Sequence, residues 1–206
     1  MFLKDGLLRI GTLFDFKKNE TFNQAVGDRR EGSHFPYITF DEPRSIEDMT
    51  PTEKGFVSNI INMQSGVSFS SVSIGQIVTS SDYFIYCLTT IPSKKTMEFF
   101  ECDTCIEIPN PRYFFRTLTR EMHEYVESQV WRGPINYIDK EYHLSQDSGL
   151  HPATTKDPSF EYQKEYRGIW IPNKKIIESG ELSPFLINAP KAVKGCRLVN
   201  LKNKYL

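Results

Sequence analysis

Residues 82–90 (DYFIYCLTT) restrict the fold more than any other stretch, because apolar and β-forming side chains follow one another with almost no polar break. A strand of this composition is buried on both faces, which places it in the middle of a sheet. The run ends in two hydroxyl side chains, Thr89 and Thr90, where a buried strand would emerge at a cleft. The sequence therefore predicts a sheet built around this strand.

The rest of the chain predicts further strands. Residues 7–14 alternate so that Leu7, Arg9, Gly11 and Leu13 share one face of the first of them. Additional strands are predicted at residues 56–63, 67–77, 105–108, 135–138, 160–170 and 196–201. Residues 17–39 are polar and charged, with a turn or mobile loop expected at residues 27–32, and residues 139–158 are polar and are expected to form a long loop.

One strong helix is predicted. Asn110 is a suitable N-cap and Pro111 a suitable first helical residue. The apolar residues that follow recur at helical spacing to about Gln129, and their aromatic stripe is expected to face the core rather than a cofactor.

Composition limits the fold class and the compartment. At 206 residues and 39% hydrophobic content, the chain can bury a core as a single domain covering residues 1–206, of the α+β class with a mixed or antiparallel sheet and one main helix.

No apolar run approaches the roughly 18 residues of a membrane span and the N-terminus lacks a signal pattern, so a cytoplasmic protein without membrane partners is expected. With 25 Lys and Arg against 26 Asp and Glu, no global basic field favours nucleic acid, although a local patch stays open. The oligomeric state cannot be inferred from the sequence.

The cysteines do not predict a metal site. Cys102 and Cys105 form the single C-x-x-C pair, whereas a zinc ribbon requires two such pairs or a matching pair of histidines. Cys105 leads into a predicted strand rather than a helix, which argues against a redox motif. We expect free thiols in a reducing compartment.

The stretch 160–170 combines aromatic, β-forming and charged residues. As one strand, it directs Gln163, Glu165 and Arg167 to one face and Tyr166 to the other. An amide two residues before a carboxylate can hold two neighbouring hydroxyls of a sugar. The alternative is an exposed strand edge that carries a Glu–Arg pair.

Arg9 is the second candidate functional residue. A lone arginine among apolar neighbours needs a partner, because an unpaired buried charge costs several kcal/mol. That partner is either a carboxylate of the protein or an anionic ligand, which a guanidinium binds well.

The order of an arginine, strand-end hydroxyls and Gln-x-Glu resembles the arginine–serine–glutamate branch of the ADP-ribosyltransferase superfamily. The same layout resembles a group of bacterial and phage proteins that we associate with that core. Three short segments, around Arg9, Thr89 and Glu165, carry the resemblance. It implies an ADP-ribosyltransferase-like fold and an NAD-dependent enzyme, a toxin or defence effector, that transfers ADP-ribose to a protein or nucleic-acid acceptor.

The resemblance also implies where NAD would bind. Arg9 would hold the pyrophosphate, Thr89 and Thr90 would shape the nicotinamide pocket, and Tyr166 would stack on a ring. The family's Ser-Thr-Ser motif is replaced here by residues 87–89 or 88–90. A rival placement of the motif is residues 68–70, which read Ser-Phe-Ser.

The catalytic pair implied by the resemblance is Gln163 and Glu165. Cleavage of the nicotinamide–ribose bond generates an oxocarbenium-like sugar, which a carboxylate beside the ribose stabilises. Glu165 would supply that charge, and Gln163 would orient the acceptor or water.

The sequence is also compatible with functions other than ADP-ribose transfer. The alternative is a non-enzymatic binding or inhibitory protein of a phage–host or defence system, in which the same residues are structural. A nuclease is disfavoured because no Asp-x-n-Glu-x-Lys pattern stands out, and a Cys–His hydrolase because no nucleophile turn flanks Cys87 or Cys102. Transferase chemistry requires Arg9, Thr89 and Glu165 to converge on one cleft, whereas a binding module does not.

Overall fold

The computed structural model describes residues 2–17, 27–180 and 182–199. The α-helices are α1 Phe2–Asp5, α2 Pro51–Ser58, α3 Lys94–Phe99, α4 Pro111–Glu121 and α5 Lys174–Ser179, and the 3-10 helices are η1 Asp15–Lys17, η2 Leu144–Gln146, η3 Pro152–Thr154 and η4 Pro158–Gln163. The strands are β1 Leu7–Thr12, β2 Ser33–Phe40, β3 Arg44–Ser45, β4 Ser68–Phe69, β5 Val72–Gly75, β6 Val78–Thr79, β7 Phe84–Thr89, β8 Cys105–Glu107, β9 Val126–Pro134, β10 Asn136–Tyr137, β11 Glu141–His143, β12 Thr155–Lys156, β13 Glu165–Pro172, β14 Phe185–Asn188 and β15 Arg197–Val199.

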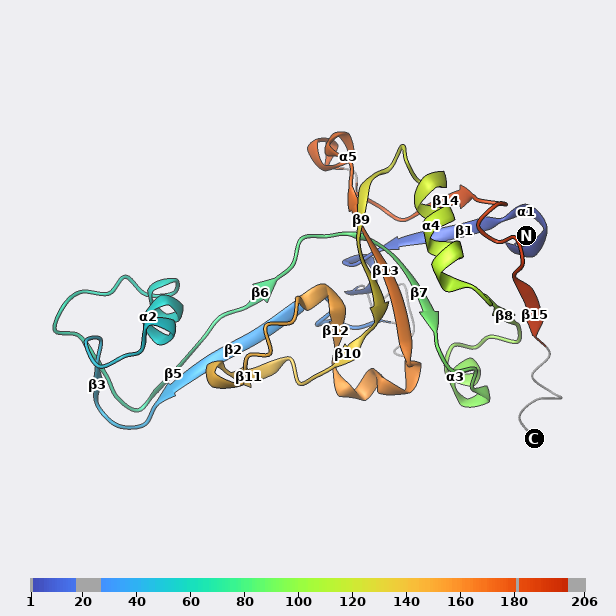
Figure 1. The fold of residues 1–206 in the computed structure, drawn as a ribbon. Helices are drawn as coiled ribbons and strands as arrows, with labels where there is room; N and C mark the ends of the chain where they lie inside the picture. The colour runs from blue at the N-terminus through green and yellow to red at the C-terminus, as the bar shows by residue number, and fades with distance from the viewer. Residues whose placement is uncertain (1, 18–26, 181, 200–206) are drawn as a thin grey trace.

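Five strands form the central sheet in the order β14-β1-β7-β13-β9, and all neighbouring pairs are antiparallel (Figure 1). The apolar strand β7 lies third in this order, so its predicted central position is confirmed. Its ladder with β13 covers the whole strand from Phe84 to Thr89, whereas its ladder with β1 is limited to Phe84 and Ile85. Beyond Ile85, β1 and β7 separate.

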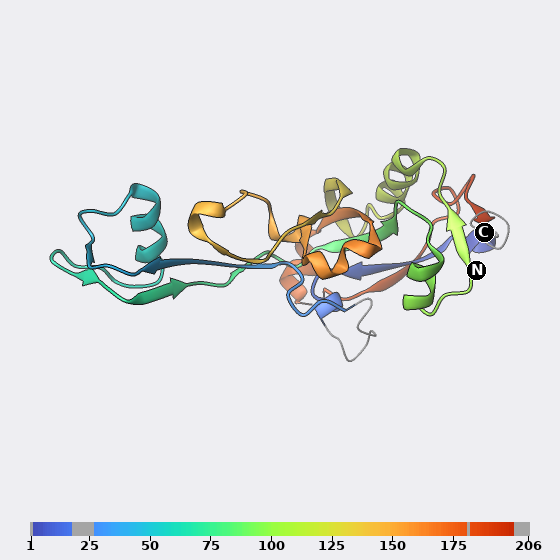
Figure 2. The ribbon, with the colours of Figure 1, turned by 90° about the horizontal axis from the view of Figure 1, so that it is seen from below.

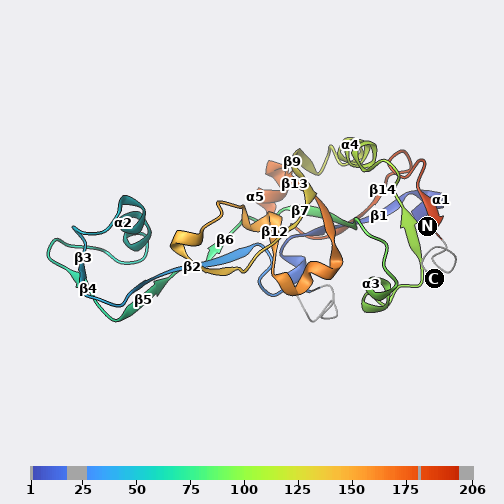
Figure 3. The same cartoon turned by 60° about the horizontal axis from the view of Figure 1, so that its bottom comes forward.

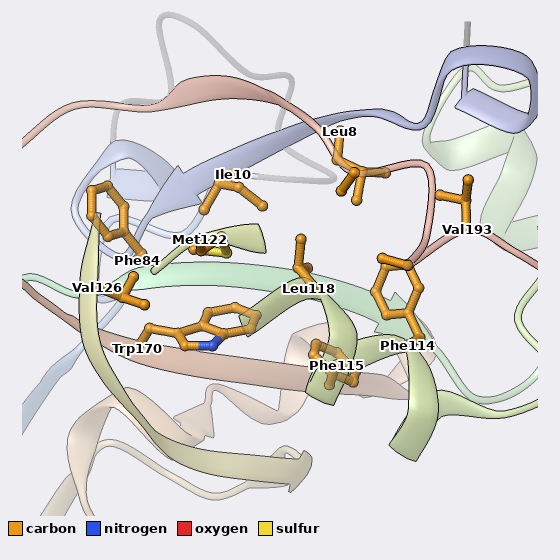
Figure 4. Close-up of a cluster of buried hydrophobic side chains, with 12 residues drawn as sticks. Leu8, Ile10, Phe84, Phe114, Phe115, Leu118, Met122, Val126, Trp170 and Val193 are labelled. Carbon is orange, nitrogen blue, oxygen red and sulfur yellow. The ribbon is translucent and has the colours of Figure 1, made fainter. Parts of the chain in front are cut away.

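Helix α4 covers one face of this sheet. Phe114, Phe115, Leu118 and Met122 point from the helix toward β1, β7 and β13 and pack around the buried indole of Trp170 (Figure 4). Gly168 of β13 allows this close approach, because a Cβ atom there would lie only 2.4 Å from Phe115 Cε1.

The predicted start of α4 is confirmed and its predicted end is wrong. The Asn110 side chain accepts a hydrogen bond from the Tyr113 backbone N–H, and Pro111 occupies the first turn. The helix ends at Glu121, however, and the chain turns into β9 at Val126. Tyr125 and Val126 satisfy the helical spacing, yet a β-branched and an aromatic residue fit a strand start equally well.

An arm extends from the sheet, as the views in Figures 2 and 3 show. Strand β2 pairs along one edge with β5 and β6, and along the other edge with β11, in parallel. Helix α2 and the β3–β4 pair lie at the end of the arm, which has its own apolar cluster. That cluster consists of Ile38, Phe40, Met49, Phe56, Val57 and Ile74.

The arm corrects one prediction and contains one strand that was not predicted. Residues 56–63 do not form a strand, because residues 56–58 complete α2. Thr50 and Glu53 form a reciprocal capping box before this helix, a signal that outweighs the β-forming side chains that follow. Strand β2, Ser33–Phe40, was not predicted and begins directly after the turn expected at residues 27–32; residues 18–26 lie outside the described chain.

The fold is thus a single α+β domain with antiparallel sheets and two longer helices, α2 and α4. Two short pairings, β10–β12 and β11–β2, are parallel. Within the described residues, the helices are all too short or too polar to cross a membrane.

Candidate functional site

The predicted catalytic residue Glu165 belongs to a buried ion network on the sheet face opposite α4. Its carboxylate accepts from Arg167 Nε at 2.6 Å and pairs with Lys156 Nζ at 2.7 Å. Glu31 completes the group through Arg167 Nη1 at 2.9 Å and Lys156 Nζ at 3.8 Å. The four side chains are at most 4% exposed, and their two positive and two negative charges balance.

The network keeps Glu165 and Lys156 ionised. Burial alone would raise the pKa of Glu165, but the charges of Arg167 and Lys156 hold it well below its usual range. Burial likewise opposes the charge of Lys156, yet Glu165 and Glu31 raise its pKa above the ordinary value. Glu165 is therefore a buried anion whose charge is already neutralised by two neighbours.

Gln163 reaches the same network from a different element. It ends η4, and the next residue, Lys164, has a left-handed backbone with φ of 43°. The strand begins only at Glu165, so the prediction that both residues alternate along one strand is wrong. Both side chains nevertheless contact one cation, because Lys156 Nζ donates to Gln163 Oε1 at 2.7 Å.

Cys87 lies beneath this network on β7. Its thiol donates a hydrogen bond to Glu165, and burial together with the Glu165 charge raises the pKa of the thiol. A thiol held protonated is a poor nucleophile, so Cys87 does not support hydrolase chemistry. Among the described residues, no group of three or more His, Cys, Asp or Glu side chains is arranged to hold a metal ion.

Arg9 lies outside this network. Its Nη2 atom is 2.6 Å from Asp15 Oδ2, and 43% of its side chain is exposed. Asp15 follows β1 by one turn, so the partner is a local carboxylate of the protein, one of the two alternatives predicted from the sequence.

A groove of about 550 Å³ contains the other three predicted site residues, Thr89, Thr90 and Tyr166. Residues 88–90 at the end of β7 form one wall and residues 105–109 form the other. The Thr89 hydroxyl lies 2.9 Å from the Gln163 carbonyl oxygen, and the Thr90 hydroxyl donates to the Lys164 carbonyl at 3.0 Å. The two hydroxyls thus fasten the end of β7 to the turn before β13.

Charge at the groove is confined to one pair. Glu107 is the one ionisable acid among the lining residues, and Arg197 of β15 donates to both of its oxygens, at 2.8 and 3.0 Å. No Lys or Arg of the described chain lines the groove.

The structure therefore groups the predicted residues in three places. Thr89, Thr90 and Tyr166 share the groove, Gln163 and Glu165 share the buried network, and Arg9 stands apart. The sequence-based predictions did not include Glu31 and Lys156, which come from segments expected to be loops. A buried arginine on a strand requires an anion, but no local pattern in the sequence indicates that Glu31 supplies it or that Lys156 joins the group.

Comparison with known proteins leaves the site to be interpreted from its own geometry. The chain matches no family model, no curated protein and no solved structure.

Proposed function

We propose that this protein is a non-enzymatic binding module whose groove receives an uncharged, extended segment of a partner polypeptide. The observation that carries the proposal is the open edge of β7. The strand continues to Thr89 along the groove, while its ladder with β1 stops at Ile85. No other strand of the described chain pairs with that edge of residues 86–89.

The backbone of this edge is oriented for strand addition. The Thr90 N–H donates to Lys164 on the β13 side, so alternation turns the N–H and C=O groups of Cys87 and Thr89 the other way. An added segment would form main-chain hydrogen bonds there, which supply affinity largely independent of sequence. Leu88, Ile106 and Tyr166 would then select apolar side chains.

Charge favours a neutral ligand over a dinucleotide. A pyrophosphate is normally bound by cations or by a helix N-terminus; the lining residues include Pro111 at the start of α4 but no Lys or Arg to neutralise its charge. Glu165 is also unsuited to stabilise an oxocarbenium ion, because Lys156 and Arg167 already neutralise it under 4% exposure.

The test is a selection with a displayed library of random peptides. Wild-type protein is expected to enrich an uncharged consensus with alternating apolar residues. Ile106→Lys, which places a charge in the groove wall, should abolish enrichment. Leu198→Lys is the matched control, since Leu198 pairs with Ile106 across β8–β15 but is 63% exposed and outside the lining.

Hydrogen exchange distinguishes strand addition from simple groove filling. A selected peptide should protect the amide of Thr89, which points away from β13, more than the amide of Leu88. No consensus, or binding that survives Ile106→Lys, would refute the proposal.

NAD-dependent ADP-ribose transfer is the second candidate, favoured by the meeting of Thr89, Thr90 and Tyr166 in one groove. Nicotinamide release from NAD should be measured for wild type, Arg9→Ala and Glu165→Gln. The binding proposal expects no release from any of them. Release by wild type that is weakened in Arg9→Ala, or that is lost in Glu165→Gln while circular dichroism shows this variant to be folded, would replace it with the transferase.

A further inference from the structure

The outer strand of the arm contains no charged residue. From Gly55 to Ser81 the sequence has no Asp, Glu, Lys, Arg, His or Pro, although a quarter of the whole chain is charged. Exposed strand edges are normally protected by charges, prolines or bulges, which prevent pairing with another chain. This edge lacks the first two devices.

The edge is also regular. Strands β5 and β6 pair with β2 in one common register, Tyr37↔Gly75 to Phe40↔Val72 and Ser33↔Thr79 to His34↔Val78, and no register shift separates the two ladders. Strand β11 covers the far edge of β2, while no strand of the described chain pairs with the outer edge of β5 and β6 (Figure 3).

The outward backbone groups follow from the observed hydrogen bonds. The Gln76 N–H donates to Pro36 and the Ser80 N–H donates to Gly32, both toward β2. Alternation then directs the N–H and C=O groups of the odd-numbered residues between 73 and 79 to the open edge. Four successive donor–acceptor positions are thus available to a second strand.

We propose that this edge pairs with the same edge of a second copy of the chain, antiparallel and about a two-fold axis at Gln76. In this register Gly75 of each copy faces Ile77 of the other, and Ser73 faces Thr79. These two pairs consist of outward odd-numbered residues, as hydrogen-bonded antiparallel pairs require, and they alternate with non-hydrogen-bonded pairs such as Gln76 with Gln76. Charged residues near the two-fold axis of a self-pairing edge would lie close to the same charges of the second copy, which is unfavourable. Residues 73–79 contain no charged side chain.

The side chains beside the edge fit this register. Ile77 is 69% exposed, the highest value among the exposed large hydrophobic residues. A shallow groove of about 410 Å³ lies next to it, lined by Tyr37 and the Cβ-free Gly75 among others. Residues directly opposed on an antiparallel pair share a face, so Ile77 of one copy would cover Gly75 and enter this groove of the other.

The charge distribution also favours an antiparallel pair. Residues 33–80 have five carboxylates against two Lys or Arg, whereas the rest of the chain has 21 against 23. Antiparallel pairing directs the acidic end of each arm toward the body of the other copy, away from the second acidic end. The partner that fits this edge best is therefore the chain itself, independently of what the β7 groove binds.

Sedimentation velocity over a concentration series tests the proposal. The wild-type chain of 23.9 kDa should form a closed dimer with rising concentration. Ile77→Lys and Ile77→Glu should each weaken self-association at least about tenfold, because like charges then meet across the axis. A mixture of the two variants should recover the dimer.

Ile177→Lys is the matched control, since Ile177 is a 56% exposed isoleucine on α5, away from the arm, and this variant should dimerise as the wild type does. At a concentration where the wild type is monomeric, circular dichroism and melting temperature should be equal for all variants, because residue 77 is solvent-exposed in the single chain. A wild type that stays monomeric at the highest soluble concentration would overturn the proposal. So would open-ended polymers, or a dimer that persists in Ile77→Lys.

Discussion

The two faces of the central sheet are buried in opposite ways. Toward α4, strand β13 presents Tyr166, Gly168 and Trp170 to the largest apolar cluster; toward the other side it presents Glu165 and Arg167 to an ion network, beside a smaller apolar cluster that includes Ile169. Burial of apolar side chains stabilises the fold without requiring particular contact angles. Buried charges offset the free-energy cost of their desolvation only when each has its ionic and hydrogen-bond partners. We infer that the α4 face supplies most of the stability and that the ionic face determines which loops dock on the sheet.

The largest expected effect comes from breaking the ionic face. Glu165→Gln leaves Lys156 and Arg167 short of a buried anion and should lower the free energy of unfolding by about 3–5 kcal/mol. The matched control is Glu161→Gln, because Glu161 also pairs with a lysine at 2.7 Å but is 58% exposed. The control should change the stability by less than about 1 kcal/mol in urea denaturation. Equal small losses would mean that the network does not act as a unit.

The apolar face should be nearly as sensitive to truncation. Leu118→Ala removes a fully buried side chain between α4 and the sheet and should cost about 2–5 kcal/mol, through lost burial and the cavity that remains. Leu186→Ala, at a 63% exposed position of β14, should stay within about 0.5 kcal/mol. A similar loss in both variants would show that α4 is not firmly packed.

The apolar face could be predicted from the sequence because its signals are local. The run in residues 82–90 identified the central strand, and the periodicity after Pro111 identified α4. The final strand was predicted at residues 196–201 and is observed as β15, with residues 200 and 201 outside the described chain.

The ionic face could not be predicted because its partners are remote in sequence. Arg167 meets Glu31 across 136 residues, and no local pattern encodes such a pairing. Gln163 was assigned to the strand because the residue that interrupts it, Lys164, is a lysine. A left-handed backbone is usually recognised in a sequence by glycine or asparagine, and neither stands at this position. Thr89 lies near Tyr166 and not near Arg9 because β1 and β7 separate after Ile85. The alternation of side chains along a strand predicts which face a residue occupies, but not where two strands separate.

Acid should weaken the ionic face while the apolar face is unaffected. The folded-state pKa of Glu165 lies below its unfolded value because Arg167 and Lys156, against the effect of burial, stabilise the anion. Its stabilisation is therefore fully present above the unfolded pKa of about 4.3 and is lost as the pH falls toward the folded pKa. The decline of unfolding free energy below pH 4.3 should be shallower in Glu165→Gln than in wild type and Leu118→Ala. Equal slopes in all three would contradict this assignment.

The smallest effect should come from His34, where β2 leaves the body beside the ionic face. The ring is 3% exposed and contacts Thr155 Oγ1 at 2.8 Å, and burial, with the Lys140 charge, lowers its pKa. The unfolded state then binds the proton more readily, so stability should fall as the pH drops from about 6.5 toward the lower folded pKa. His34→Gln should flatten the stability profile in that window, whereas His123→Gln, on an exposed ring, should not. If the wild-type profile is already flat in that pH window, the surroundings do not hold His34 neutral. The contacts of its ring with Thr155 and the nearby Lys140 are then more open to water than the 3% exposure of His34 indicates.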